Sequence, residues 1–212
     1  MRRVKRFAVM AVSAMLVSLV IPAGALAGGE RHRLEFGSRP PMTDVKMKNV
    51  DGDSISISDV SGGRGTLVIF SCNACPWVKA WENRIAELGN TYSERGVGVI
   101  VINANDPDQV AEDRYEVMQE RAQEKEFRFP YVVDSTSRVA AAFGATRTPE
   151  IFLFDGELRL VYHGAIDDNA KEPDKVESHY LREALEALLA GKPIEVRQTK
   201  ALGCSIKFRN QA

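Results

Sequence analysis

Two cysteines, Cys72 and Cys75, stand three positions apart, directly after the apolar run of residues 67–70. From Cys75 onward, apolar residues recur in steps of three and four, which predicts an amphipathic helix that begins at this pair. The N-terminus of a helix presents free N–H groups and a partial positive charge, and both favour a thiolate over a thiol. Because the thiolate is the form that attacks disulfides, the pair predicts thiol-disulfide exchange.

The two thiols are expected to differ in role. Cys72 lies at the end of the loop and should be the more exposed and more nucleophilic thiol, whereas Cys75, one turn inside the helix, should resolve the mixed disulfide. Trp77, one residue away from the buried stripe of the helix, fits either the core or a substrate contact at the border of the site. Residues 67–70 carry no acid that could help to deprotonate Cys75. Glu82, farther along the expected helix, is either the base for Cys75 or a solvated surface acid.

Three other roles fit these cysteines. Zinc could take Cys72, Cys75, Cys204 and one histidine, although the chain has no second closely spaced cysteine pair. Copper could take the pair together with His163. A structural disulfide is the third role, but a strand-to-helix corner is an unusual place for one. We therefore expect neither a metal nor another cofactor.

A second motif, Thr148-Pro149, stands directly before another apolar run. A proline at the first residue of a strand costs no ladder hydrogen bond, so it could simply mark the start of that strand. Together with the cysteine pair, however, it resembles the thioredoxin superfamily, in which a cis Thr-Pro bond precedes a strand and lies against the cysteines. The resemblance implies a cis bond at Thr148-Pro149 and a Thr148 backbone that binds an extended substrate chain.

Apolar periodicity and turn residues predict the elements that position these motifs. Residues 67–70 and 97–102 are apolar runs bounded by turns, which predict buried strands. The other expected elements are a hairpin within residues 45–59, helices from Cys75 to Gly96 and from an N-cap at Asp106 to about Lys125, a strand at 131–133, a short helix at 138–143, strands at 151–154 and 158–163, and a last helix from Val176 to Leu189. This order predicts a three-layer α/β fold with a mixed central sheet flanked by helices.

A closer resemblance runs from about residue 45 to residue 207. It rests on residues 72–80, 102–106, 129–131, 148–150, 164–168 and 203–207. These stretches resemble the thioredoxin-like redoxin family, in the branch related to alkyl hydroperoxide reductase and thiol-specific antioxidant proteins, and the chain is similar to a peroxiredoxin with a Cys-x-x-Cys pair. Peroxiredoxins carry a threonine three residues before the peroxidatic cysteine. That position holds Ile69 before Cys72 and Cys72 before Cys75, so the peroxide-binding threonine is missing.

The N-terminal residues have the order of a secretory signal. Four basic residues lie within residues 1–6, an uncharged run covers residues 7–21, and Ala25-Leu26-Ala27 offers a cleavage site. As a helix, the uncharged run would be about 22 Å long, short of the roughly 30 Å hydrocarbon core, so cleavage is favoured over a retained membrane anchor. We expect a signal peptide at 1–27 and a periplasmic or secreted protein without stable membrane insertion.

The mature chain is expected to comprise a leader segment at 28–44, a thioredoxin-like domain at 45–191 and a C-terminal tail at 192–212. The chain has 28 Lys and Arg against 29 Asp and Glu. Since four of the bases belong to the signal, the rest is mildly acidic and a poor binder of nucleic acid.

The tail carries Cys204, an odd cysteine in an exported chain. Two roles for Cys204 stay open. In the first, the tail folds back over the domain and brings Cys204 to the Cys72–Cys75 corner as a second resolving thiol that forms a bridge with Cys72. In the second, Cys204 is a buried or merely tail-borne thiol without a redox partner.

The sequence predicts an exported thiol-disulfide oxidoreductase. In this hypothesis Cys72 attacks a disulfide of a partner protein in the cell envelope, Cys75 resolves the mixed disulfide, and the Thr148-Pro149 loop holds the substrate backbone. Two alternatives stay open: a peroxide-reducing, thiol-dependent antioxidant and a copper-binding assembly factor.

Overall fold

The structure, a computed structural model, describes residues 34–209. The predicted signal peptide at 1–27 lies outside the described residues, as does the first part of the predicted leader at 28–44. Within the described part of the chain, no helix is both long enough and apolar enough to cross a lipid bilayer.

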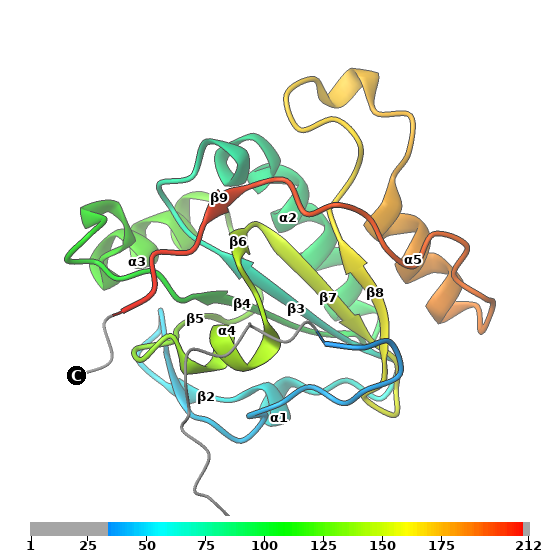
Figure 1. The fold of residues 1–212 in the computed structure, drawn as a ribbon, viewed down its shortest axis with the longest axis horizontal. Coiled ribbons are helices and arrows are strands. Elements are labelled where there is room, and N and C mark those ends of the chain that lie inside the picture. The colour runs from blue at the N-terminus through cyan, green and yellow to red at the C-terminus, as the bar shows by residue number, and fades with distance from the viewer. Residues whose placement is uncertain (1–33, 210–212) are drawn as a thin grey trace, which may run out of the picture. The chain divides into compact units, whose positions relative to one another are not determined.

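A seven-stranded sheet forms the centre of the fold (Figure 1). β3 (Thr66–Ser71) pairs in parallel with β4 (Gly98–Asn103), and β5 (Tyr131–Val133) extends the parallel part. The antiparallel strands are β1 (Met47–Asn49), β2 (Ser54–Ile55), β7 (Glu150–Phe154) and β8 (Leu160–Gly164). The spatial order is β2-β1-β5-β4-β3-β7-β8, so the predicted mixed sheet is confirmed.

Helices cover both faces of the sheet. α2 (Pro76–Glu94), α3 (Tyr115–Glu124) and α5 (Tyr180–Leu189) pack on one face, and α1 (Ile57–Val60) and α4 (Arg138–Phe143) pack on the other. The side chains of β3 divide between the two cores: Leu67 and Ile69 join the first, and Val68 and Phe70 join the second. A strand buried on both faces requires such a continuous apolar run. The three-layer α/β prediction is confirmed.

The predicted helix from Asp106 to Lys125 is wrong in its first half. Asp106 caps a turn instead, where its side chain accepts a hydrogen bond from the Asp108 amide at 3.1 Å. A 3₁₀ turn follows at Ala111–Asp113, and Arg114 has an extended backbone, so α3 begins only at Tyr115. The reason is a long-range contact, because the Asp113 carboxylate is buried against the cysteine loop and holds this segment out of helical register.

Two other boundaries also differ from the prediction. β1 and β2 form the expected hairpin, but the chain then enters α1 through a capping box in which Ser56 and Asp59 bond each other's backbone amides. The last helix starts at Tyr180 rather than Val176, because Pro173–Lys175 forms a separate 3₁₀ turn that ends at Val176.

The C-terminal tail folds back onto the domain. Its strand β9 (Cys204–Ser205) pairs antiparallel with β6 (Arg147–Thr148), and Figure 1 shows the tail, in red, running alongside β6. Ile206 is buried in the core on the α4 side of the sheet. The tail therefore returns to the domain, as one of the two hypotheses for Cys204 expects.

Candidate active site

The cysteine pair lies at the corner between β3 and α2. Cys75 is the N-cap of α2 and Pro76 is its first residue, a position that suits proline because an N–H there would have no partner. The exposed fraction is 2% for Cys72 and 3% for Cys75. The expectation that Cys72 is the more exposed thiol is therefore wrong, because Thr148 and Cys204 cover the corner.

The Thr148-Pro149 loop contacts both thiols. The peptide bond between these residues is cis, as the resemblance implies. The Thr148 hydroxyl lies 3.1 Å from Cys72 Sγ, and Cys75 Sγ lies 3.1 Å from the Thr148 carbonyl oxygen, to which it can donate when it is protonated. Two motifs that are far apart in the sequence thus form one buried cluster.

Cys204 adds a third sulfur to the cluster of Cys72 and Cys75. It lies opposite Thr148 in the β6–β9 ladder, and its Sγ is 2.8 Å from Cys75 Sγ. The tail therefore brings its thiol to the corner, as one of the two hypotheses predicts. Its nearest partner is Cys75, however, whereas the sequence suggested a link with Cys72.

The surroundings place the negative charge on Cys75. Its pKa is lowered to about 4, chiefly by the hydrogen bond from the Cys72 thiol, while burial opposes this shift and Cys204 adds to it. The same hydrogen bond, burial and the charge of Asp113 raise the pKa of Cys72. Burial and the nearby Cys75 raise the pKa of Cys204 to about 11. This order of acidity is the reverse of the expected one, chiefly because the hydrogen bond between the two thiols favours the charge on Cys75, to which the Val78 backbone N–H at the start of α2 also contributes.

The low pKa of Cys75 predicts an unusual pH profile for alkylation of the reduced protein. Because the thiolate is the reactive form, the rate of Cys75 carboxamidomethylation should rise as the pH passes about 4 and then stay level up to pH 7. An unperturbed thiol instead gains rate up to about pH 8.5. Iodoacetamide labelling read by peptide mass spectrometry measures this profile, and a rate that still climbs tenfold per pH unit between pH 5 and 7 would contradict it.

A buried carboxylate ties the site together beneath the cysteines. Asp113 is 3% exposed and accepts the backbone N–H of Asn73, within the cysteine loop, at 2.6 Å. It also accepts the side-chain amides of Asn103 at 3.0 Å and Asn105 at 2.8 Å. Asn105 in turn accepts the Lys207 backbone N–H at 2.8 Å. This network, which the sequence did not reveal, links the cysteine loop, the end of β4 and the tail.

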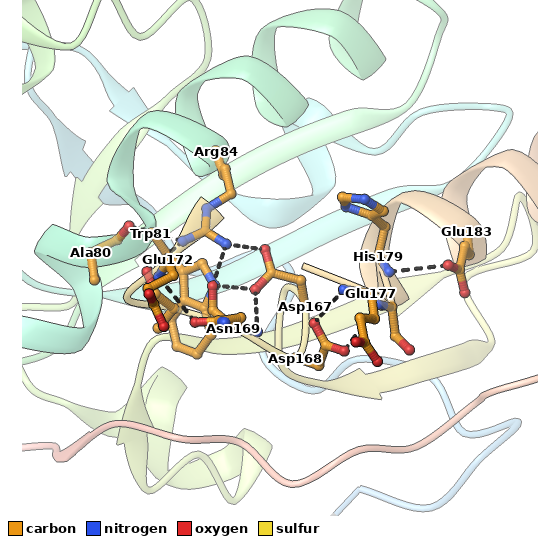
Figure 2. Close-up of polar contacts among 12 residues, drawn as sticks. Ala80, Trp81, Arg84, Asp167, Asp168, Asn169, Glu172, Glu177, His179 and Glu183 are labelled. Carbon is orange, nitrogen blue, oxygen red and sulfur yellow. Dashed lines mark hydrogen bonds and ion pairs between the residues drawn. The ribbon is translucent and has the colours of Figure 1, made fainter. Parts of the chain in front are cut away.

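The loop after β8 fixes the direction of α2. Trp81 Nε1 donates to Asp167 Oδ1 at 2.7 Å, and Arg84 forms an ion pair with the same carboxylate. Figure 2 shows Arg84 reaching from α2 toward Asp167 and Asn169. Asp168 accepts two backbone amides farther along this loop. These contacts give Asp167 and Asp168 structural roles.

Trp77 lies at the border between the core and the cysteines. It packs against the buried cluster of Cys72, Cys75 and Val78, and its ring centroid is 6.0 Å from that of Trp81. The structure therefore combines the two positions that the sequence offered for Trp77.

Two other candidate residues have structural partners. Glu82 is buried and lies 3.4 Å from Arg121 and 3.5 Å from Lys125, both on or next to α3, so the description of a solvated surface acid is wrong. His163, considered as a copper ligand, is buried with its Nε2 2.8 Å from Glu150 Oε1. Among residues 34–209, no three His, Cys, Asp or Glu side chains are grouped so that they could hold a metal ion.

Comparisons with known proteins identify the family of the chain. The AhpC/TSA family matches residues 39–163, more than half of the chain. A protein named thiol-disulfide oxidoreductase ResA, from Halalkalibacterium halodurans, is 27% identical over 131 residues, which cover 59% of this chain and 68% of that protein. An uncharacterized conserved protein from Geobacillus kaustophilus is 36% identical, with a TM-score of 0.78 over 84% of this chain and 94% of that one.

A thioredoxin-like protein in its oxidised form is 20% identical, with a TM-score of 0.58 over 73% of this chain and 97% of that one, and this likeness shows the fold. The chain therefore has a thioredoxin-like fold and belongs to the AhpC/TSA family.

Proposed function

We propose that this protein is a thiol-disulfide oxidoreductase that exchanges disulfides with protein partners through Cys72 and Cys75. The observation that carries the proposal is the contact of both thiols with the cis Thr148-Pro149 loop, with the lowered pKa on one of them. The distant relatives named thiol-disulfide oxidoreductases support the same chemistry.

In this proposal the two thiols have different roles, which follow their order of acidity. The Cys75 thiolate attacks one sulfur of a partner disulfide, so that a mixed disulfide forms and the other partner sulfur leaves as a thiolate. Cys72, which loses its proton, then attacks Cys75 Sγ, closes the Cys72–Cys75 disulfide and releases the second partner thiol. The net result is two electrons moved from the pair to the partner, and the reverse sequence oxidises a partner dithiol.

The substrate chain has a ready place to bind. Thr148 presents backbone groups at the edge of β6, and β9 shows that an extended segment pairs there with a cysteine directly opposite Thr148. Backbone hydrogen bonds of this kind hold an extended peptide with little dependence on its sequence. Trp77, beside the cysteines, offers an apolar contact to the same chain.

Catalysed reduction of insulin disulfides by dithiothreitol tests this function. The protein should accelerate the reaction, and acid-quenched samples should contain a mixed disulfide that involves the Cys72–Cys75 pair. If the protein neither accelerates the reaction nor forms a mixed disulfide with insulin or with oxidised glutathione, thiol-disulfide exchange is excluded as its activity.

Peroxide reduction is the second candidate. The specific observation in its favour is a thiolate at Cys75 in contact with a further thiol, Cys204. The thiolate would take one oxygen from the peroxide and become a sulfenate, and a second thiol would then displace water to form a disulfide. Consumption of hydrogen peroxide with a thiol reductant measures this activity directly, and a rate equal to that of the reductant alone would rule it out.

We further propose that the protein works outside the cytoplasm, on thiols and disulfides of the cell envelope. The proposal rests on the order of residues 1–27 alone. Protein extracted from the envelope should begin at Gly28 when its intact mass is measured. A membrane-bound form that retains Met1 would contradict cleavage and favour an anchor.

A further inference from the structure

The C-terminal tail occupies the place that an incoming substrate would take. β9 forms an antiparallel ladder with β6 in which Cys204 lies opposite Thr148. This is the pairing that the proposed function assigns to a partner chain, and it puts a cysteine 2.8 Å from Cys75 Sγ. The chain therefore presents its own cysteine to its own redox pair.

Contacts on both sides of Cys204 hold the tail in this position. Arg147 donates to the Gly203 carbonyl oxygen at 2.9 Å, and the Ile206 N–H donates to the Thr146 carbonyl oxygen at 2.9 Å. Farther out, the Thr199 hydroxyl accepts the Ala165 N–H at 2.8 Å. Because the tail is held before and after the thiol, the placement of Cys204 follows from the fold and not from a chance contact of one side chain.

Gly203 allows the close approach of the tail. A Cβ atom at this position would lie 2.2 Å from the Thr148 carbonyl oxygen, far inside van der Waals contact, and the clash is with backbone. A side chain here would force β9 away from β6. The glycine thus makes it possible to separate docking of the tail from the chemistry of the Cys204 thiol.

We propose that the tail is a resident intramolecular substrate, and that Cys75 forms a disulfide with either Cys72 or Cys204. The inference rests on the proposed function. In the oxidised protein, Cys204 loses its proton and attacks Cys75 Sγ, the Cys75–Cys204 bond forms, the Cys72–Cys75 bond breaks, and Cys72 leaves as a thiolate that takes up the proton. No outside oxidant or reductant is needed, because one disulfide replaces another.

The two disulfides have opposite effects on access to the site. A Cys75–Cys204 bond covalently holds β9 on the Thr148 edge and closes it to partner proteins. A Cys72–Cys75 bond leaves Cys204 free, so the tail can leave and a partner can pair with β6. The tail therefore competes with protein substrates for the same edge and the same sulfur.

Peptide mapping of Cys72→Ser tests the alternative bridge. After oxidation of the full chain by oxidised glutathione and alkylation of the remaining thiols, this variant should contain a Cys75–Cys204 disulfide. Cys75→Ser, treated identically, should not form a Cys72–Cys204 disulfide. Free Cys75 and Cys204 in the oxidised Cys72→Ser variant would overturn the proposal.

The competition between tail and partner is tested with Gly203→Ala. Undocking the tail should raise the rate of reaction of the reduced protein with a disulfide-bonded peptide about tenfold, since overpacking of this kind strongly disfavours the closed state. The same change in the Cys72→Ser background should lower the yield of the Cys75–Cys204 bridge. Gly63→Ala is the matched control, because its Cβ would meet no atom within 4 Å. Equal rates in Gly203→Ala and Gly63→Ala would show that the tail does not compete with partners.

These experiments separate the two proposals. Loss of the proposed function would appear as no exchange with insulin or peptide disulfides in the wild-type protein, whether or not the Cys75–Cys204 bridge forms. Failure of the tail proposal would appear as normal exchange by the wild-type protein without that bridge in Cys72→Ser.

Discussion

Replacing Cys75 with serine is expected to lower the rate of disulfide exchange by roughly a thousandfold or more, because the variant loses the nucleophile. Cys75 is the sulfur with the lowered pKa, and it is the one that contacts the Thr148 carbonyl oxygen and Cys204. Cys72→Ser should behave differently, since it keeps the attacking sulfur and loses only the thiol that completes the Cys72–Cys75 disulfide. The rate of insulin reduction measures the first effect.

Trapping of mixed disulfides distinguishes the two cysteines further. In Cys72→Ser, Cys204 is still able to resolve a mixed disulfide on Cys75, so trapped partners should accumulate only in the double variant Cys72→Ser, Cys204→Ser. Non-reducing electrophoresis and mass spectrometry identify the linked cysteine, and Cys204→Ser alone is the control. Partners trapped by Cys75→Ser instead would assign the attack to Cys72, the order that the sequence favours.

Replacing Asp113 with alanine is expected to destabilise the fold by about 3–5 kcal/mol, because it leaves several buried N–H groups without an acceptor. These are the backbone N–H of Asn73 and the side-chain amides of Asn103 and Asn105. For a domain of this size, such a loss corresponds to a fall in Tm of roughly 10 °C or more. Thermal unfolding followed by circular dichroism measures it.

The same variant should also change the chemistry of the pair. The charge of Asp113 raises the pKa of Cys72, so its removal should move that pKa downward. Asp113→Asn removes the charge while it keeps one acceptor oxygen, and it should shift the thiol titration with a smaller loss of stability. Glu120→Ala, on the exposed side of α3, is the control for stability. A Tm for Asp113→Ala equal to that of Glu120→Ala would show that the network is not structural.

Local patterns were sufficient to predict the elements that carry the cysteine pair. The apolar run of residues 67–70 and the spacing of apolar residues after Cys75 depend on neighbouring positions only, and β3 and α2 follow them closely. The cis bond at Thr148-Pro149 came from a resemblance between motifs rather than from periodicity. In both cases the information lay in short stretches of the chain.

Long-range contacts explain what the sequence did not predict. Asp113 stands among charged residues of an expected surface helix, and only its distant partner Asn73 makes it a buried acceptor. Glu82 is buried because α3 brings Arg121 against it. The similar burial of Cys72 and Cys75 depends in part on a tail that arrives more than a hundred residues later in the chain. No local pattern encodes such contacts.

The two alternative bridges enclose chain segments of very different length. Cys72 and Cys75 are near neighbours, whereas 129 positions separate Cys75 from Cys204. In the chain-entropy model, a crosslink stabilises a fold by restricting the unfolded chain, by about 2 kcal/mol for the short ring and about 5 kcal/mol for the long one. An exchange between the two bridges would therefore change the resistance of the whole domain to unfolding, although the protein neither gains nor loses an electron.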